Sequence, residues 1–310
     1  MYLRGTEMPF IKSSHKPIQI LKSALDNSVN YVFESKQEAR FVQRSQDEVI
    51  VYLSTHNGCN KSCRFCHLTQ SGQTSFEESS IDDLCMQAMT AIHTYKRTEE
   101  NNAKTLHFNF MARGEPLSSS VIQKQWHALS NHLVGIGKSY GFDTIKLKIS
   151  TIIPEEVTDL ISIFPVGCIQ PEIYYSFYSI DSEFRKRWMP KSSPWQKSLF
   201  LLSAWQSETG GRVVVHNAFI KGENDVISSE SLKHYYLHQF GIKYDYNIVR
   251  YNPFSTESSM EVDADSLIHL YDTAKNLMRG QGNLQIIDRV GYDTSCSCGM
   301  FVNLKGTNSK

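Results

Sequence analysis

Three cysteines that lie close together in the sequence have the type and spacing of ligands to a metal centre. Cys59, Cys63 and Cys66 are separated by three and two residues. A tetrahedral zinc site takes four ligands, usually as two distant pairs, whereas a 4Fe-4S cluster held by three cysteines leaves one iron open for a substrate or cofactor. The spacing therefore favours an iron–sulfur cluster. The alternatives are a zinc site completed by His56 or His67, and three unconnected cysteines.

The surroundings of these cysteines resemble those of the radical S-adenosylmethionine (SAM) superfamily. The shared features are the Cys-x3-Cys-x2-Cys spacing, the aromatic Phe65 before the third cysteine, and the position of the loop after the first βα-type strand. In that superfamily the open iron chelates the amino and carboxylate groups of SAM, and one electron cleaves SAM to a 5'-deoxyadenosyl radical. The resemblance therefore implies two cofactors, a 4Fe-4S cluster and SAM.

Gly114, Glu115 and Pro116 form a second candidate binding element. A glycine permits close approach to the backbone, and a carboxylate beside it can accept hydrogen bonds from the ammonium group of SAM. The same tripeptide on its own would be interpreted as a turn. Because it follows a predicted strand downstream of the cysteines, we expect Gly114 and Glu115 to bind SAM.

The elements that must position these residues are β-rich segments that alternate with helical patterns from about Val49 onward. The six segments are Val49–Ser54, Thr105–Met111, Thr144–Ser150, Glu172–Phe177, Arg212–Ile220 and Tyr244–Tyr251. A strand followed by a helix, repeated, is typical of parallel βα units, and right-handed crossovers curl such units into a barrel. The sequence thus predicts an α/β fold, with a partial (β/α)6 barrel at residues 49–288 and its site at the carboxyl ends of the strands.

Residues 1–48 are predicted to form a small appendage in front of the barrel. A short helix is expected near Pro17–Leu25, followed by a hairpin through Val29–Glu34 and Glu38–Gln43. A segment of this length is too short to bury a core of its own, so we expect it to pack on the barrel.

The chain after the sixth strand contains a further predicted strand and a polar tail. The strand is Leu284–Asp288, and the tail, residues 289–310, carries Cys296 and Cys298. The tail is too polar to add another helix, and we expect it to fold over the barrel mouth.

Composition restricts the class of protein. The chain has 310 residues, 40% of them apolar, and equal numbers of basic and acidic side chains, 32 of each. No run approaches the roughly 20 apolar residues of a membrane span, and Met1–Phe10 lacks a secretory h-region, so a soluble, cytoplasmic protein is expected. Zero formal charge gives no overall attraction to nucleic acid. In a reducing compartment, the seven cysteines are ligands, catalytic thiols or core fillers such as Cys85 and Cys168.

From Glu38 onward the chain resembles the RlmN and Cfr family, which methylates adenine C2 in ribosomal RNA and, for RlmN, also in transfer RNA. The matching segments are Gly58; Met111–Leu117, with Arg113 replacing a smaller residue; Ser150-Thr151; Ser176-Phe177-Tyr178, where the family has Ser-Leu-His; Asn252-Pro253-Phe254; and Cys298-Gly299. The resemblance implies that SAM is contacted by Gly114, Glu115, Ser150, Ser176, Phe177, Tyr178 and Asn252.

The same resemblance implies catalytic roles. In the family, the last cysteine is methylated by a first SAM, a radical from a second SAM attacks that methyl group, and the resulting carbon radical adds to adenine. Cys298 is at this position. The family's resolving cysteine is replaced by Tyr52, so either Cys296 takes over its role or the reaction differs. Glu38 matches the family's general base if one residue is inserted at Ser45–Asp47, and an ordinary strand glutamate is the alternative.

The predicted function is therefore radical SAM methylation, or other alkylation, of an sp2 carbon of a base, most simply adenine C2 in RNA. The predicted partners are ribosomal or transfer RNA and a flavodoxin- or ferredoxin-type electron donor, with no membrane. The family's N-terminal helical domain, which helps to hold RNA, has no counterpart here. Phe184–Lys191 is a basic and aromatic candidate for RNA contacts, unless it is a solvated helix end with a buried tryptophan.

Two other functions compete with this prediction. The first is a radical SAM enzyme with a non-methylating reaction on a small molecule, a free nucleotide or a peptide, which Tyr52 and Tyr178 favour. The second is a non-catalytic RNA-binding or iron–sulfur sensing protein.

Overall fold

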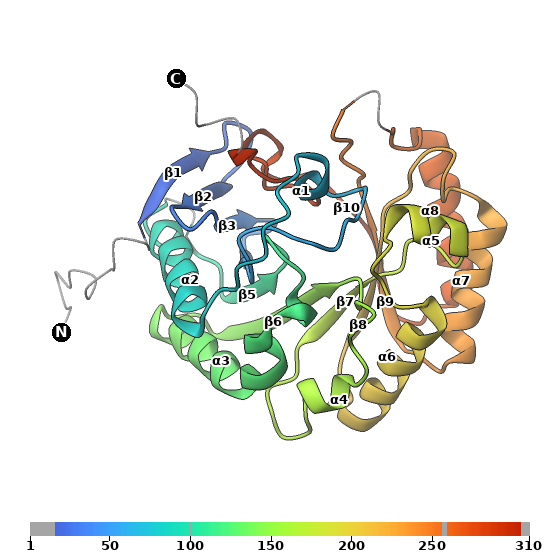
Figure 1. The fold of residues 1–310 in the computed structure, drawn as a ribbon, viewed down its shortest axis with the longest axis horizontal. Helices are drawn as coiled ribbons and strands as arrows, with labels where there is room; N and C mark the ends of the chain where they lie inside the picture. Colours follow the sequence, from blue (N-terminus) through green and yellow to red (C-terminus); the bar gives the residue numbers. More distant parts are fainter. Residues whose placement is uncertain (1–15, 99–100, 256–258, 305–310) are drawn as a thin grey trace.

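The computed structural model describes residues 16–98, 101–255 and 259–304, in which ten strands form one sheet whose spatial order follows the chain (Figure 1). The strands are β1 (Pro17–Lys22), β2 (Val29–Phe33), β3 (Glu38–Gln43), β4 (Glu48–Tyr52), β5 (Thr105–Phe110), β6 (Thr144–Thr151), β7 (Glu172–Ser176), β8 (Val213–Asn217), β9 (Tyr244–Val249) and β10 (Leu284–Ile287). The helices are α1 (His67–Gln70), α2 (Ile81–Tyr95), α3 (Ser120–Ser139), α4 (Leu160–Ile163), α5 (Ser182–Trp188), α6 (Trp195–Thr209), α7 (Ile227–Gln239) and α8 (Ala264–Met278), with short 3-10 turns η2 (Pro116–Ser118) and η3 (Tyr292–Thr294).

The partial barrel predicted from the sequence is confirmed. Strands β4 to β10 pair in parallel, each with its neighbour in the chain, and helices cover the outside of the curved sheet (Figure 1). The further strand predicted at Leu284–Asp288 is β10, and it pairs in parallel with β9. The described part of the parallel sheet therefore has seven strands, one more than the six βα units.

Alternation along the barrel strands separates two environments. Leu106 and Phe108 of β5 are fully buried and belong to one apolar cluster with side chains of α2 and α3. His107, between them, and Asn109, after Phe108, are also buried but face the opposite side of the sheet, toward the barrel interior. Each strand is thus covered on both faces, and its carboxyl end carries polar side chains inward.

Helix α2 shows how local sequence signals fix an element. Ser80 accepts a hydrogen bond from the backbone N–H of Asp83, and the Asp83 carboxylate accepts one from the N–H of Ser80, which is a complete capping box. Leu84 and Ile92 then lie on the face that packs against the sheet, and both are fully buried. The cap sets the start of α2, the first long helix after the loop that carries the three cysteines.

The N-terminal segment differs from the prediction at one element. The segment near Pro17–Leu25, for which a helix was expected, is strand β1, paired antiparallel with β2. Ile18 and Ile20 are exposed on this edge strand. Apolar side chains of this segment are therefore not buried against the barrel, as those of a packed helix would be. Pairing with the free edge of β2 satisfies the backbone instead. The predicted hairpin is present as β2 and β3, and β3 pairs with β4, which joins the N-terminal segment to the barrel sheet.

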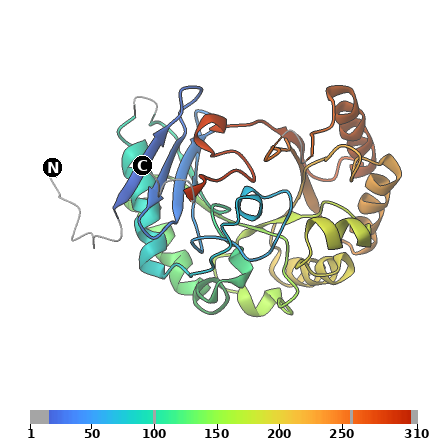
Figure 2. The ribbon, with the colours of Figure 1, turned by 45° about the horizontal axis from the view of Figure 1, so that its top comes forward.

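The tail crosses from β10 to the N-terminal strands. The side-chain amide of Asn30 donates to the Thr294 carbonyl at 3.0 Å, and the Arg40 guanidinium donates to the Ser295 carbonyl. Figure 2 shows the red tail beside the blue strands at the mouth of the barrel. The tail therefore bridges the two ends of the sheet.

Candidate active site

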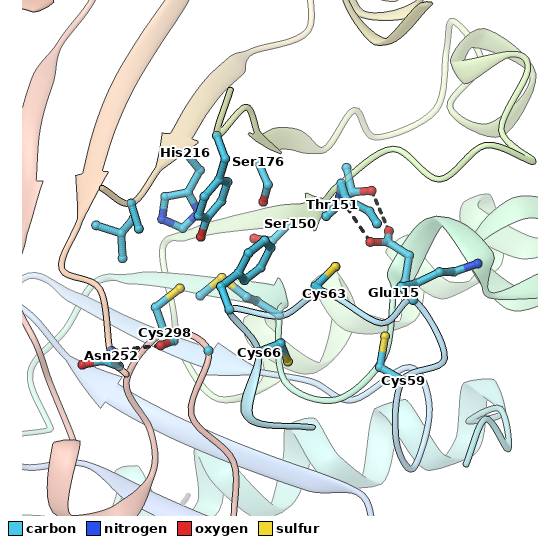
Figure 3. A pocket seen from close by; sticks show the side chains of 18 of the residues that line it. Cys59, Cys63, Cys66, Glu115, Ser150, Thr151, Ser176, His216, Asn252 and Cys298 are labelled. Carbon is cyan, nitrogen blue, oxygen red and sulfur yellow. Dashed lines mark hydrogen bonds between the residues drawn. The ribbon is translucent and has the colours of Figure 1, made fainter. Parts of the chain in front are cut away.

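One pocket at the carboxyl ends of the barrel strands collects most of the residues predicted to do chemistry (Figure 3). Every barrel strand from β4 to β9, or the loop that follows it, contributes, and so does the tail. The predicted site residues on its lining are Cys59, Cys63, Cys66, Gly114, Glu115, Ser150, Ser176, Tyr178, Asn252 and Cys298. Parallel strands all end on the same side, which is why residues far apart in sequence meet here.

The loop after β4 presents the three cysteine thiols. Gly58 is needed at its start because a Cβ there would lie 2.5 Å from the Ser75 carbonyl oxygen and 2.6 Å from that of Gln73. The Cys66 N–H donates to the Cys63 carbonyl at 3.1 Å, which folds the loop back on itself. The tight packing turns all three sulfurs into the pocket lining.

The charges around the thiols fit a bound cationic cluster. Burial, together with the other cysteines of the loop, raises the pKa of Cys59 to about 12 and that of Cys63 well above its ordinary value. Thiolates at this density need a compensating positive centre. Within the described residues, no group of three Cys, His, Asp or Glu side chains is close enough for a single metal ion. Cysteines that each bind a different iron of a cluster need not meet at one point.

The zinc alternative lacks its fourth ligand. His56 does not line the pocket, and its ring stacks on Phe76 with the ring centres 3.7 Å apart. His67 does not line the pocket either, and its Nε2 lies 3.1 Å from the Asn252 carbonyl oxygen. Both histidines are engaged elsewhere, so the loop itself offers three thiols, as a three-cysteine 4Fe-4S cluster requires.

The loop after β5 brings a buried carboxylate beside the cysteines. Gly114 has φ +102°, and a Cβ there would lie 2.5 Å from Nδ1 of His56, so this turn requires glycine. The Glu115 carboxylate accepts hydrogen bonds from Thr151 Oγ1 at 2.6 Å and from the N–H groups of Leu117 and Ile152. Burial raises the pKa of Glu115 to about 7. The arrangement gives a fixed acceptor suited to an ammonium group.

The ends of β6 to β9 add polar groups, with one exception among the predicted residues. Ser150 donates to the Asn109 side-chain carbonyl at 3.1 Å, and the Tyr178 ring stacks on Phe65 with centres 4.4 Å apart. Phe177 does not line the pocket and is fully buried in the main core. Its neighbours Ser176 and Tyr178 face the pocket, and alternation turns Phe177 the other way. The structure gives Phe177 a packing position, with no pocket contact for SAM.

Cys298 reaches the same pocket from the tail. Its carbonyl accepts a hydrogen bond from Asn252 Nδ2 at 2.9 Å, and the next carbonyl, of Gly299, accepts one from the His67 N–H at 2.9 Å. Burial raises the pKa of the Cys298 thiol to about 11. The pocket therefore holds a fourth thiol, on a different segment from the three cysteines of the loop.

Comparison with known proteins finds relatives in sequence and in fold. No protein-family model matches the sequence. The probable dual-specificity RNA methyltransferase RlmN of Chlorobium phaeobacteroides is 25% identical over 243 residues, which are 77% of this chain and 62% of that protein. The RlmN of Clostridioides difficile is 24% identical over 289 residues, 91% of this chain and 78% of that protein. A radical SAM methyltransferase from Sphaerobacter thermophilus has the same fold, with TM-score 0.75 and 16% identity over 93% of this chain and 81% of that chain.

The chain has the fold of radical SAM enzymes. It resembles RlmN, and it spans less than two thirds of the length of the Chlorobium relative. The cofactors that go with this assignment, a 4Fe-4S cluster and SAM, fit the three thiols, the buried carboxylate and the polar strand ends described above.

Cys296 lies outside the pocket. It is buried in a small apolar cluster that includes Tyr52, Ile50 and Ala112. Ser295 has φ +58°, so the backbone turns between Thr294 and Cys298 rather than running straight. Cys296 therefore lies next to Tyr52, the residue at the position of the family's resolving cysteine, while Cys298 faces the cluster loop.

Glu38 also lies outside the pocket, so its proposed role as general base finds no support in the geometry. Its side chain is fully buried and forms an ion pair with Arg113, with Arg113 Nη2 at 2.6 Å from Glu38 Oε1. Asn30 Nδ2 donates to Oε2, and the Val302 N–H donates to Oε1. Both carboxylate oxygens therefore accept hydrogen bonds from neighbouring residues, away from the pocket.

Several lining residues were not among the predicted site residues, although some of them, such as Thr151 and Gly299, lie within the motifs quoted above. They are Lys61, Phe65, Thr69, Met111, Ala112, Thr151, Ile152, His216, Ala218, Val249, Arg250, Tyr251, Gly299 and Phe301. Most of them adjoin a predicted residue or end a strand, so extending each motif by one position would have found them. His216 was signalled only by its place at the end of β8, where its backbone is paired with that of Ser176 on β7.

The basic segment Phe184–Lys191 is largely occupied by internal contacts. Arg185 is buried and donates to the Ser193 carbonyl at 2.8 Å, while Arg187 pairs with Glu223. The Trp188 indole is buried and its N–H donates to the same carboxylate, at 3.0 Å. These side chains form a helix end with a buried tryptophan, while Lys186, Arg187 and Lys191 remain exposed.

The two remaining cysteines lie outside the pocket. Cys85 and Cys168 are partly buried, and Cys168 packs against the main core. All seven cysteines are free thiols. None of the described helices is long and apolar enough to cross a membrane.

Proposed function

We propose that the chain is a radical SAM methyltransferase that alkylates an sp2 carbon of a nucleic acid base, most simply adenine C2 in RNA, by way of methylated Cys298. The observation that carries the proposal is that Cys298 lines the same pocket as the three cysteines of the cluster loop. Such a route needs a thiol outside the cluster, because sulfur must first accept the methyl group and later leave. The names of the relatives, RNA methyltransferases, point the same way.

The residues of the pocket divide this work. Cys59, Cys63 and Cys66 would hold the cluster, and Glu115 and the polar strand ends Ser150, Ser176 and Asn252 would hold SAM. Once bound, the cluster and SAM supply the methyl group and the one-electron chemistry. The aromatic side chains of Phe65, Tyr178, Tyr251 and Phe301 line the pocket and exclude water from reactive species.

His216 is the group that we assign as proton acceptor. Loss of a proton from the ring carbon must end the reaction, and Glu38 is occupied by Arg113. The His216 imidazole lines the pocket beside Ser176, and burial lowers its pKa to about 4. It is therefore neutral at physiological pH, the form in which a ring nitrogen can accept a proton.

Mass spectrometry of the purified protein tests the proposal. Protein made with ample SAM is expected to carry one methyl group on Cys298, and Cys298→Ala is expected to lose it. Anaerobic reconstitution should give a brown protein that forms 5'-deoxyadenosine from SAM. A colourless protein, or an unmodified Cys298 in protein that cleaves SAM, contradicts the proposal.

A second candidate is a radical SAM reaction on a small molecule, a free nucleotide or a peptide. Two observations favour it: the formal charge is zero, and two arginines of the basic segment, Arg185 and Arg187, are engaged within the protein. Comparing nucleosides from digested cellular RNA, with and without the gene, separates the candidates. A missing methyladenosine supports the RNA substrate, and an unchanged profile supports the small-molecule reaction. In either case the electron donor that we propose is of the flavodoxin or ferredoxin type.

A further inference from the structure

The tail that carries Cys298 has no regular structure to hold it in place. Between β10 and Leu304, the described tail contains only the short turn η3. A thiol that must receive a methyl group has to be held within a small distance of the reacting atoms. The position of Cys298 must therefore come from side chains of the barrel that bind the tail.

A buried ion pair binds the tail just after Cys298. Arg113 Nη2 donates to the Val302 carbonyl at 2.7 Å, and the Val302 N–H donates to Glu38 Oε1 at 3.1 Å. Arg113 and Glu38 are themselves joined by Nε to Oε1 at 2.8 Å. The pair thus presents one donor and one acceptor to both polar groups of a single tail residue.

The same guanidinium also binds the cluster loop. Arg113 Nη1 donates to the Asn57 carbonyl at 3.2 Å, two residues before Cys59, and to the Gln73 side-chain carbonyl at 3.0 Å. Gln73 in turn donates to the Val302 carbonyl and accepts from the Leu304 N–H. One charged group therefore connects the loop with the cluster cysteines to the tail with Cys298.

A second arginine binds the tail on both sides of Cys298. Arg40 donates to the carbonyls of Ser295 and Met300. The Phe301 ring, which lines the pocket, lies 5.1 Å from the Arg40 guanidinium and 5.9 Å from that of Arg113. The two guanidinium groups beside this ring hold the Phe301 side chain in place, three residues after Cys298.

From these contacts we propose that Arg113 and Glu38 are a positioning pair that holds the tail with Cys298 against the cluster loop. Neither lines the pocket, so neither is a catalytic residue. The proposal rests on the proposed function for the role of Cys298. It also explains two departures from the family pattern: an arginine where the family has a smaller residue, and a Glu38 that is not free to act as a base.

A buried ion pair is suited to fixing geometry. Its Coulomb energy roughly cancels the cost of desolvation, so it adds little net stability, but its directional bonds select one arrangement. An apolar pair of similar volume would fill the same space without binding Val302. An apolar replacement of the pair therefore distinguishes a role in positioning the tail from a role in the stability of the whole protein.

Two variants test the pair. Glu38→Leu/Arg113→Met replaces the ion pair by apolar side chains, and Val302→Pro leaves the pair intact but removes the N–H that binds Glu38. We expect hydrogen–deuterium exchange of the backbone between Gly299 and Leu304 to be about tenfold faster in both, as expected for lost hydrogen bonds, with little change in the barrel strands. If the double variant does not fold, Val302→Pro decides alone.

The control is Glu230→Gln in α7. Glu230 also forms a buried ion pair, with Lys233, but neither residue contacts the tail. We expect this variant to destabilise the whole protein without selective exchange in the tail. Exchange in the tail that stays at the wild-type rate in Val302→Pro, or that rises equally in Glu230→Gln, overturns the proposal.

A second readout links the pair to Cys298. The methyl occupancy of Cys298 is expected to fall in Val302→Pro at unchanged iron content, because the cluster ligands are not touched. Arg113→Lys keeps the charge but not the forked contacts, and is expected to be intermediate. If wild-type Cys298 carries no methyl group, the proposed function fails, whereas the exchange experiment still decides whether the pair anchors the tail.

Discussion

The side-chain amide of Asn252, at the end of the last βα unit, donates a hydrogen bond of 2.9 Å to the carbonyl of Cys298. The other end of the amide is fixed by Arg289, whose Nε donates to Asn252 Oδ1 at 2.7 Å. The Asn252 carbonyl lies 3.1 Å from His67 Nε2, on the helix that follows the cluster cysteines. One residue therefore joins the barrel, the cluster loop and the tail at the pocket.

Asn252→Asp should weaken methylation more than folding. The carboxylate can still accept from Arg289, but it cannot donate to the Cys298 carbonyl, and two acceptor oxygens then face each other. The cost is about 1–3 kcal/mol, or about tenfold or more in the rate of Cys298 methylation, measured by mass spectrometry against time.

Asn247→Asp is the matched control for Asn252→Asp. Asn247 lies on β9, is equally buried, and accepts a hydrogen bond from Gln285 away from the pocket. We expect it to lower the melting temperature and to leave the rate of Cys298 methylation within about twofold of wild type. Equal loss in both variants would mean that the Asn252 contact has no special role.

Cys63→Ala should abolish cluster binding. Cys63 is the most buried of the three cysteines of the loop and belongs to an apolar cluster with Tyr178 and Trp188. Loss of one of three thiolates leaves two irons without protein ligands, so reconstituted protein should lose its brown colour and its 5'-deoxyadenosine formation.

Cys168→Ala controls for the loss of a partly buried thiol. Cys168 lies beside His127, outside the pocket, and its removal should leave iron content unchanged. A Cys63→Ala protein that binds iron as wild type does would show that the loop is not the cluster site. If Cys63→Ala lost its iron and the wild type itself formed no 5'-deoxyadenosine, a non-catalytic sensing role would be favoured.

His216→Gln should separate the two stages of the proposed reaction. Methylation of Cys298 does not need a proton acceptor at the substrate carbon, so methyl occupancy should stay near that of wild type. Formation of methylated product should fall by about 10²–10⁴-fold, the usual range for loss of a general base. Mass spectrometry of the protein and of the nucleosides measures both. Product formation at the wild-type rate would remove His216 from the mechanism.

The sequence predicted the barrel because each βα unit repeats the same local pattern. Strands covered on both faces are almost continuously apolar, and the cap at Ser80 marks the start of α2. Segment 17–25 was misassigned because its pairing with β2 is a property of the free sheet edge rather than of its own residues. Short edge elements therefore depend on tertiary context that a local pattern does not contain.

The site divides in the same way. Cys59, Cys63, Cys66, Glu115 and Asn252 lie in short motifs with a fixed place at strand ends, and all of them line the pocket. The positions of Glu38 and Cys296 depend on long-range contacts, with Arg113 for the first and with Tyr52 for the second. Neither contact can be recognised from the residues next to Glu38 or Cys296 in the sequence. A motif match therefore predicts an active-site position for both residues, which the pocket does not include.

His107 should make the stability of the protein depend on pH. It is buried inside the barrel, with Nε2 3.3 Å from Glu48 Oε1, but burial together with the positive charges of Lys148, Lys146 and Arg212 outweighs this carboxylate and lowers its pKa to about 2. In the unfolded chain its pKa is near 6.5, so below that pH the unfolded state binds a proton that the folded state does not. This contribution to stability is fully present above pH 6.5 and is lost as the pH falls. Between pH 6.5 and 5.0 the free energy of unfolding should fall by about 2 kcal/mol from this residue alone.

Urea unfolding of the wild type and of His107→Gln at pH 7.0 and 5.0 measures the effect. The free energy of unfolding should change less between the two pH values in the variant than in the wild type, by about that amount, whatever the absolute stability of the variant. An equal difference in the two proteins would mean that His107 is hydrated or charged in the folded state.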